Sequence, residues 1–93
     1  MKEEFKVGDW VLLNRKNKKG VEFEYTSEME GKILVGKVID VVGFSTLILL
    51  GIEFTEYVDG HSCEGKGKGG YCWYVNSKKC KKLSKKEAML HIL

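Results

Sequence analysis

Short apolar runs rich in β-branched side chains, separated by glycine-containing polar turns, recur along this chain of 93 residues and constrain its fold most strongly. The longest run, Ile33–Val42, contains six valines and isoleucines within ten residues. Branched side chains pack well on a pleated surface and lose rotamer freedom in a helix, so these runs predict strands. The predicted strands are Val7–Asn14, Ile33–Val42, Thr46–Phe54, Tyr71–Val75 and Cys80–Leu83, with a sixth candidate at Val21–Tyr25.

Two local signals refine this pattern. Gly36, inside the longest run, predicts a bulge or bend in that strand. Ser84 and Glu87 stand three residues apart, which is the spacing of a capping box at a helix N-terminus. We therefore expect a short helical tail at about 84–93, with three of its residues turned inward: Ala88, Met89 and Ile92.

The number and spacing of the strands indicate the architecture. Five to six short antiparallel strands, with one long polar excursion at 16–32, fit a small closed barrel. Closure removes the unpaired strand edges that a small open sheet would expose. Because 93 residues form one domain, we predict a single all-β domain over 1–93. It comprises a small SH3-like β-barrel at about 5–83 and the short C-terminal helix at about 84–93.

Composition limits the cellular setting. The hydrophobic fraction of 43% is enough for a packed core, and no apolar run approaches the roughly 18 residues that a membrane span needs. The segment Met1–Phe5 lacks the apolar stretch of a secretory signal. These features predict a folded cytoplasmic protein with no role in a membrane.

Charge is distributed unevenly along the chain. Residues 1–60 hold eight basic and eleven acidic side chains, whereas residues 61–93 hold eight lysines against two glutamates. A basic C-terminal third is typical of a protein that binds an acidic partner or phosphate. Arg15 is the sole arginine, and base readout and bidentate phosphate clamping depend on arginine. The composition therefore favours an acidic protein surface as partner over sequence-specific nucleic-acid recognition.

The sequence shows no arrangement typical of an enzyme. His61 is not accompanied by a nucleophile elbow or a Ser/Cys–His–Asp pattern. The glycine-rich stretch Gly65–Gly70 does not match the phosphate-loop pattern, because no Lys-Ser/Thr pair and no helix signal follow it. We expect His61 to pin its loop through hydrogen bonds to backbone carbonyls, with partner binding as the alternative, and the loop to be flexible and basic. No catalytic residue and no cofactor are predicted.

Zinc is a second candidate ligand. His61, Cys63, Cys72 and Cys80 together supply one imidazole and three thiols, which is a sufficient ligand set. Structural zinc sites, however, usually contain two cysteines separated by two to four residues, and this chain has no such pair. We therefore predict that the cysteines behave as small buried hydrophobes, and a zinc-stabilised module stays as an alternative.

Aromatic side chains complete the predicted binding site. Tyr71, Trp73 and Val75 share one face of their strand, and Cys72 and Tyr74 share the other. One face belongs to the core, so either Trp73 or Tyr74 is left to contact a partner. An aromatic beside lysines is typical of a peptide or single-strand nucleic-acid site. The predicted partner-binding residues are His61, Lys66, Lys68, Trp73, Tyr74, Lys78, Lys79, Lys81 and Lys82.

Three segments resemble SH3-like barrels of the CAP-Gly and KOW kind. They are Val7-Gly8-Asp9-Trp10-Val11, Gly36-Lys37-Val38 and Gly51-Ile52-Glu53-Phe54-Thr55-Glu56. The resemblance implies the barrel fold. CAP-Gly domains grip an acidic, aromatic peptide with a Gly-Lys-Asn-Asp-Gly loop, whereas the corresponding stretch here, at 65–69, has no Asn-Asp pair.

A second resemblance covers Phe54 to Val75. Phe54, Glu56, Gly60-His61, Gly65, Gly70 and Cys72-Trp73-Tyr74-Val75 are similar to a pattern in small uncharacterised bacterial and bacteriophage proteins. This resemblance supports the fold and implies no established activity. The small size and a bacteriophage setting, taken with the resemblance, favour a module that modulates or inhibits a host or defence protein. We therefore predict a non-enzymatic module that docks on a protein partner, with a KOW-like nucleic-acid-binding barrel as the alternative.

Overall fold

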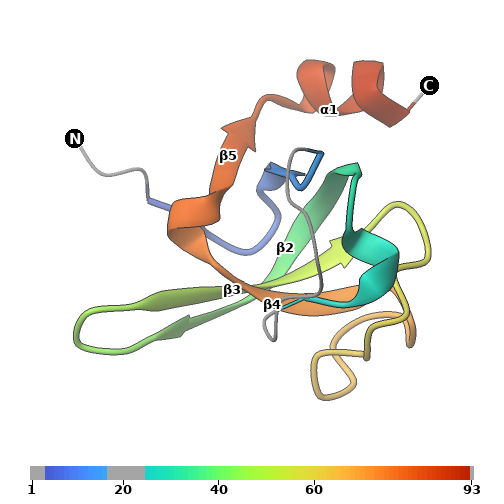
Figure 1. The fold of residues 1–93 in the computed structure, drawn as a ribbon. Coiled ribbons are helices and arrows are strands. Elements are labelled where there is room, and N and C mark those ends of the chain that lie inside the picture. The colour runs from blue at the N-terminus through green and yellow to red at the C-terminus, as the bar shows by residue number, and fades with distance from the viewer. Residues whose placement is uncertain (1–3, 17–24, 93) are drawn as a thin grey trace.

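The computed structural model describes residues 4–16 and 25–92 and contains one antiparallel sheet of five strands, in the order β4-β3-β2-β1-β5 (Figure 1). The elements are β1 (Trp10–Asn14), a short 3₁₀ helix η1 (Ser27–Met29), β2 (Ile33–Gly43), β3 (Ile48–Phe54), β4 (Cys72–Asn76), a second 3₁₀ helix η2 (Ser77–Lys79), β5 (Cys80–Leu83) and α1 (Lys85–Ile92). The mostly β fold with a C-terminal helix is confirmed. The sixth candidate strand falls largely on residues 21–24, which lie outside the described residues.

The long strand β2 is shared between two partners. Its first part pairs with β1 over Ile33–Lys37, and its second part pairs with β3 over Gly36–Gly43. A Cβ at Gly36 would lie 2.4 Å from the Ile52 Cγ2 and 2.7 Å from the Glu53 carbonyl oxygen. The predicted bulge at Gly36 is wrong, because the register irregularity falls between Val38 and Asp40. Glycine is required at position 36 by the close approach of β3.

The main core lies on one face of the sheet. It joins residues from β1 to β4 with the segment around η1 and with Val58, and each large apolar side chain buried there contributes roughly 1.5–3 kcal/mol. A smaller cluster on the other side joins Val35, Leu83 and Ala88. The main core consists of Val11, Leu13, Tyr25, Met29, Leu34, Val38, Leu50, Ile52, Phe54, Val58 and Val75.

The C-terminal helix begins as the sequence predicts. The backbone N–H of Ser84 donates to Glu87 Oε1 at 2.9 Å, and the backbone N–H of Glu87 donates to Ser84 Oγ at 3.1 Å, which completes a capping box. Ala88 is buried in the smaller cluster and Met89 packs against it. The inward placement of Ile92 is wrong, since 41% of its surface is exposed. The last turn of α1 extends past the cluster that Ala88 contacts.

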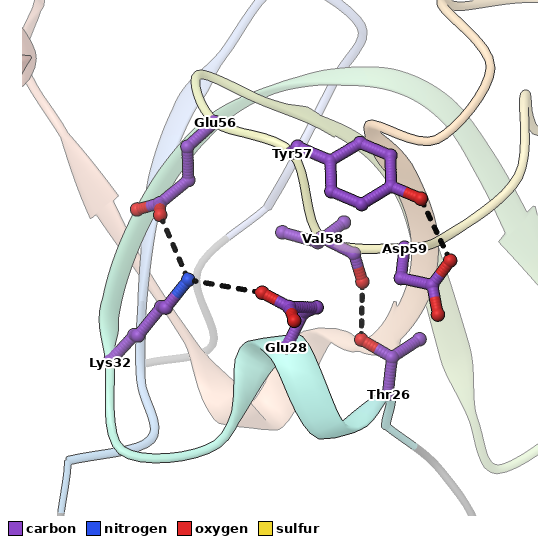
Figure 2. A network of polar contacts seen from close by, with 7 residues as sticks. All are labelled: Thr26, Glu28, Lys32, Glu56, Tyr57, Val58 and Asp59. Atoms are coloured by element: carbon purple, nitrogen blue, oxygen red, sulfur yellow. Dashed lines mark hydrogen bonds and ion pairs between the residues drawn. The ribbon is translucent and has the colours of Figure 1, made fainter.

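A polar network fastens the segment around η1 to the chain that follows β3 (Figure 2). The Thr26 hydroxyl donates a hydrogen bond to the Val58 carbonyl. The Lys32 Nζ lies 3.7 Å from the Glu28 carboxylate and 3.3 Å from the Glu56 carboxylate. Exposed ion pairs contribute little, so the half-buried Thr26 bond and the buried Val58 side chain are the stronger ties. These two contacts hold Val58 in place at the start of the loop at 59–70.

Candidate functional site

The glycine-rich loop at 59–70 folds back onto the sheet instead of projecting as a flexible hairpin. His61 exchanges two backbone hydrogen bonds with Cys72, at 2.9 Å and 3.0 Å, and so extends the pairing beyond β4. At the base of the loop, the backbone N–H groups of Val58 and Gly60 both donate to the Gly70 carbonyl. Ser62 accepts from the Gly67 N–H at 2.9 Å and closes the loop internally.

Gly67 of this loop packs closely against the sheet. A Cβ at this position would lie 2.5 Å from Cys72 Sγ, 2.6 Å from Ile39 Cδ1 and 3.0 Å from Glu53 Oε2. The backbone N–H of Lys68 donates to the same Glu53 oxygen at 2.8 Å. The flanking lysine side chains are exposed while the glycine between them is packed, so the loop displays its charges from a fixed backbone.

The three cysteines are thiols with shielded sulfur atoms. Cys63 and Cys72 are fully buried beneath the loop, and burial, with a smaller effect of the neighbouring Cys72, raises the pKa of Cys63 to about 12. Burial likewise raises the pKa of Cys72, and that of Cys80 to about 12. All three are therefore protonated at neutral pH, which disfavours both metal ligation and nucleophilic attack. The burial predicted for the cysteines is confirmed for Cys63 and Cys72.

The candidate zinc ligands are not brought together. The Nδ1 of His61 accepts a hydrogen bond from the Cys63 N–H at 2.9 Å, which occupies this nitrogen within the loop. Across residues 4–16 and 25–92, no group of three His, Cys, Asp or Glu side chains could hold a metal ion. His61 pins its loop as predicted, but its partner is a backbone N–H and not a carbonyl.

His61 also joins the aromatic residues of β4. Its ring centroid lies 5.0 Å from that of Trp73 and 5.7 Å from that of Tyr74, with interplanar angles of 30° and 37°. Trp73 packs against the main core, and both Trp73 and Tyr74 are half-buried. Since β4 is the last strand in the order, side chains from both of its faces reach the imidazole. The sequence left open which of the two aromatics faces solvent, and in the structure each is partly exposed.

These rings border a hollow of about 260 Å³. Its volume lies below the range of roughly 300–1,000 Å³ typical of sites for drug-sized ligands, and suits one large apolar side chain. Sequence reasoning missed Leu47 and Leu49, because the run Thr46–Phe54 is apolar throughout and does not distinguish its two faces. The hollow is lined by Tyr25, Leu47, Leu49, His61, Trp73, Tyr74, Val75 and Asn76.

A charged group stands beside this hollow. The Tyr74 hydroxyl donates to Asp40 Oδ2 at 2.7 Å, and the Lys66 Nζ lies 3.5 Å from the same oxygen. The hydrogen bond from Tyr74, followed by the charge of Lys66, lowers the pKa of Asp40 against the opposing effect of burial. The same hydrogen bond is the main cause of a raised pKa at Tyr74. Asp40 therefore stays ionised, and one of its oxygens contacts both the Tyr74 hydroxyl and the exposed Lys66.

The other predicted lysines lie elsewhere. Lys68 sits over the ring of Tyr71, with its Nζ 4.4 Å from the ring centroid. Lys82 pairs with Asp9 at 3.4 Å on the β5 side of the sheet. The structure thus groups His61, Trp73 and Tyr74 around one hollow, and Lys66 contacts the Asp40 oxygen that also accepts the Tyr74 hydroxyl. The remaining predicted residues, Lys78 and Lys79 on η2 and Lys81 on β5, are exposed on a separate part of the chain.

Comparison of the chain with protein-family profiles, with curated protein sequences and with solved structures finds no match. Among the described residues, no helix is long and apolar enough to cross a membrane.

Proposed function

We propose that this chain is a non-enzymatic binding module that docks on an acidic surface of a protein partner. One observation carries the proposal: His61, Trp73 and Tyr74, from two separate segments, meet around a hollow with the exposed Lys66 beside it. Aromatic side chains at a pocket rim are enriched among residues that dominate binding energy, and a neighbouring cation adds charge complementarity. The hollow would receive one apolar side chain of the partner, and Lys66 an adjacent carboxylate.

The chemistry of the candidate nucleophiles supports binding over catalysis. The Cys63 thiol has its pKa raised to about 12, so almost none of it is thiolate at neutral pH. The Nδ1 of His61 accepts a hydrogen bond from a backbone N–H, so this nitrogen holds the loop in place. By occupying a surface, such a module would act as an inhibitor or modulator of its partner.

The chain path supports an SH3-like barrel as the scaffold of this module. β4 and β5 lie at opposite ends of the strand order, yet only the three residues of η2 separate them. Five strands in a flat sheet would place these edges about 19 Å apart, whereas the chain from Asn76 to Cys80 spans at most about 14 Å. The sheet must therefore curve so that its two edges approach each other.

A peptide selection tests the proposed function. The protein would be used to select from a display library of random peptides, and we expect the enriched peptides to combine an aromatic or large aliphatic residue with Asp or Glu. The variant His61→Asn keeps an acceptor near the Nδ1 position but removes the ring, and we expect it to lose most of the affinity. Lys66→Gln should weaken binding several-fold, and Lys85→Gln on α1, with the same change of charge, should leave it unchanged. Failure to enrich any such peptide would contradict the proposal.

Nucleic-acid binding is the competing outcome. Fluorescence anisotropy with labelled single-stranded DNA and RNA would detect it, because affinity for phosphates falls steeply as salt concentration rises. A salt-sensitive complex that is unaffected by His61→Asn and weakened by charge removal at Lys78, Lys79 and Lys81 would move the function to the η2–β5 lysines.

A further inference from the structure

The hairpin of β2 and β3 carries the longest uncharged stretch of the described chain. Residues 41–52 contain no charged side chain, although 31% of all residues are charged. The hairpin turn, closed by a hydrogen bond from the Phe44 N–H to the Leu47 carbonyl, projects at one end of the sheet (Figure 1) and borders a hollow that Phe5, Lys78 and Cys80 also line. Three apolar side chains at this end are well exposed: Val41 at 38%, Phe44 at 58% and Ile48 at 46%.

The outer edge of β2 is open along this part of the hairpin. β1 pairs only with Ile33–Lys37, and the backbone of Val38 exchanges hydrogen bonds of 2.8 Å with Gly8 and Asp9. Beyond that point, the described residues provide β2 with no pairing partner except β3.

The side of β2 to which the Val41 N–H and C=O groups point can be derived from the paired strands, because successive residues of a strand direct these groups to alternate sides. Phe54 donates its N–H to Tyr71, towards β4, so Leu50 on the same strand also directs its backbone groups towards β4. Val41 lies opposite Leu50 in the β2–β3 ladder. Its N–H and C=O therefore point away from β3, to the open edge.

We propose that this edge pairs with the same edge of a second copy of the chain, so that two sheets join antiparallel through their β2 strands. Proteins usually protect an exposed strand edge with charged residues, proline or a covering segment. The edge from Val41 to the hairpin turn has no charge and no proline. The net charge of +3 disfavours contact between copies over most of their surface, and this uncharged hairpin is where the repulsion is weakest.

The register of such a pairing is self-complementary. Centring the twofold axis on Val41 places Asp40 opposite Val42 of the second copy, so no like charges face each other. Val41 and Ile48 lie on the same face of the hairpin, which lets the exposed side chains of both copies form one apolar strip. Within each copy, the backbone of Val38 is already hydrogen-bonded to Gly8 and Asp9. The pairing between the two copies therefore ends before Val38 and is short. The resulting dimer is weak and concentration-dependent.

Sedimentation velocity on the full chain, from micromolar to millimolar concentration, tests this pairing. We expect a monomer–dimer equilibrium that rising salt does not weaken, since the interface is uncharged. The variant Val41→Lys places two like charges opposite each other and should raise the dissociation constant at least about tenfold. Val41→Thr, which is uncharged and β-branched, should retain the dimer. Leu90→Lys on α1 is the matched control, because Leu90 is 68% exposed and the same charge is added there.

Circular dichroism melts of each variant would show that the monomer remains folded, and amide exchange would report on the edge directly. In the dimer, the Val41 amide should exchange more slowly at high protein concentration. A wild-type chain that stays monomeric at millimolar concentration would overturn the proposal, as would a dimer that Val41→Lys and Leu90→Lys affect equally. Because none of these variants touches His61 or Lys66, the outcome is independent of the peptide selection.

Discussion

Replacing Gly67 with alanine tests whether the glycine-rich loop is packed on the sheet. The new Cβ would meet Cys72 Sγ at 2.5 Å and Ile39 Cδ1 at 2.6 Å, about 1 Å closer than the ordinary contact distance of roughly 3.5–4.0 Å. Cys72 cannot retreat freely, because it is fully buried within a paired strand. Overpacking of this kind costs about 1–3 kcal/mol. For a domain of this size, that cost lowers the Tm by about 4–24 °C.

Gly69→Ala is the matched control for this experiment. Gly69 lies in the same loop, and a Cβ there would meet no atom within 4 Å. With no clash, the substitution should leave stability unchanged or raise it by about 0.4–1 kcal/mol, since it restricts the unfolded chain. Thermal melts followed by circular dichroism would compare both variants with the parent chain.

The loop could instead relieve the clash by lifting off the sheet, and thiol chemistry would detect that response. In that case the Tm falls less, but Cys63 and Cys72 become accessible to a chromogenic disulfide reagent. If Gly67→Ala matches Gly69→Ala in both Tm and thiol reactivity, the packed loop described above is refuted.

Three further predictions concern the cap, the thiols and the phenol. Ser84→Ala removes half of the capping box and should cost about 1 kcal/mol, with a loss of helical signal in the circular dichroism spectrum. In the native parent chain, Cys63 and Cys72 should resist alkylation at mildly alkaline pH and react fully after denaturation, because burial raises both pKa values. The fold holds the pKa of Tyr74 above its ordinary value of 10.0, so its stabilising contribution is complete below that pH and is lost as pH rises through the higher folded value. Tyr74→Phe should accordingly remove a phenolate transition that lies well above pH 10 in an absorbance titration, and loss of a transition near pH 10 instead would contradict the Asp40 hydrogen bond.

The strands could be predicted from the sequence because each depends on local pattern. β5 occupies Cys80–Leu83 as predicted, and the capping box at Ser84 defines the start of α1 within one residue. The bulge was misplaced at Gly36 for a tertiary reason. The close approach of Ile52 that demands glycine there comes from a strand about fifteen residues further along the chain.

The candidate site was predictable only in part. Trp73 and Tyr74 stand out as aromatics on a strand, and their contact with His61 depends on a loop whose glycines indicate flexibility when read alone. Packing of Gly67 on Cys72 is a contact between a loop and a strand face, which no local pattern encodes. The sequence offers no signal that separates the predicted lysines, whereas in the structure Lys66 contacts Asp40 of β2 and the others lie on η2 and β5 or over Tyr71.

The pairing of β1 with β5 has a consequence for how the chain acquires its structure. Trp10 lies opposite Leu83 in this ladder. The backbone hydrogen bonds along this edge of β1 therefore cannot form until β5 is present. The β2–β3 hairpin, by contrast, is closed by a short turn and can form early. Contacts between distant parts of a chain slow folding, since the loop must close before any contact stabilises it. During synthesis, β1 therefore emerges long before its partner, and the late arrival of β5 should set the pace of folding.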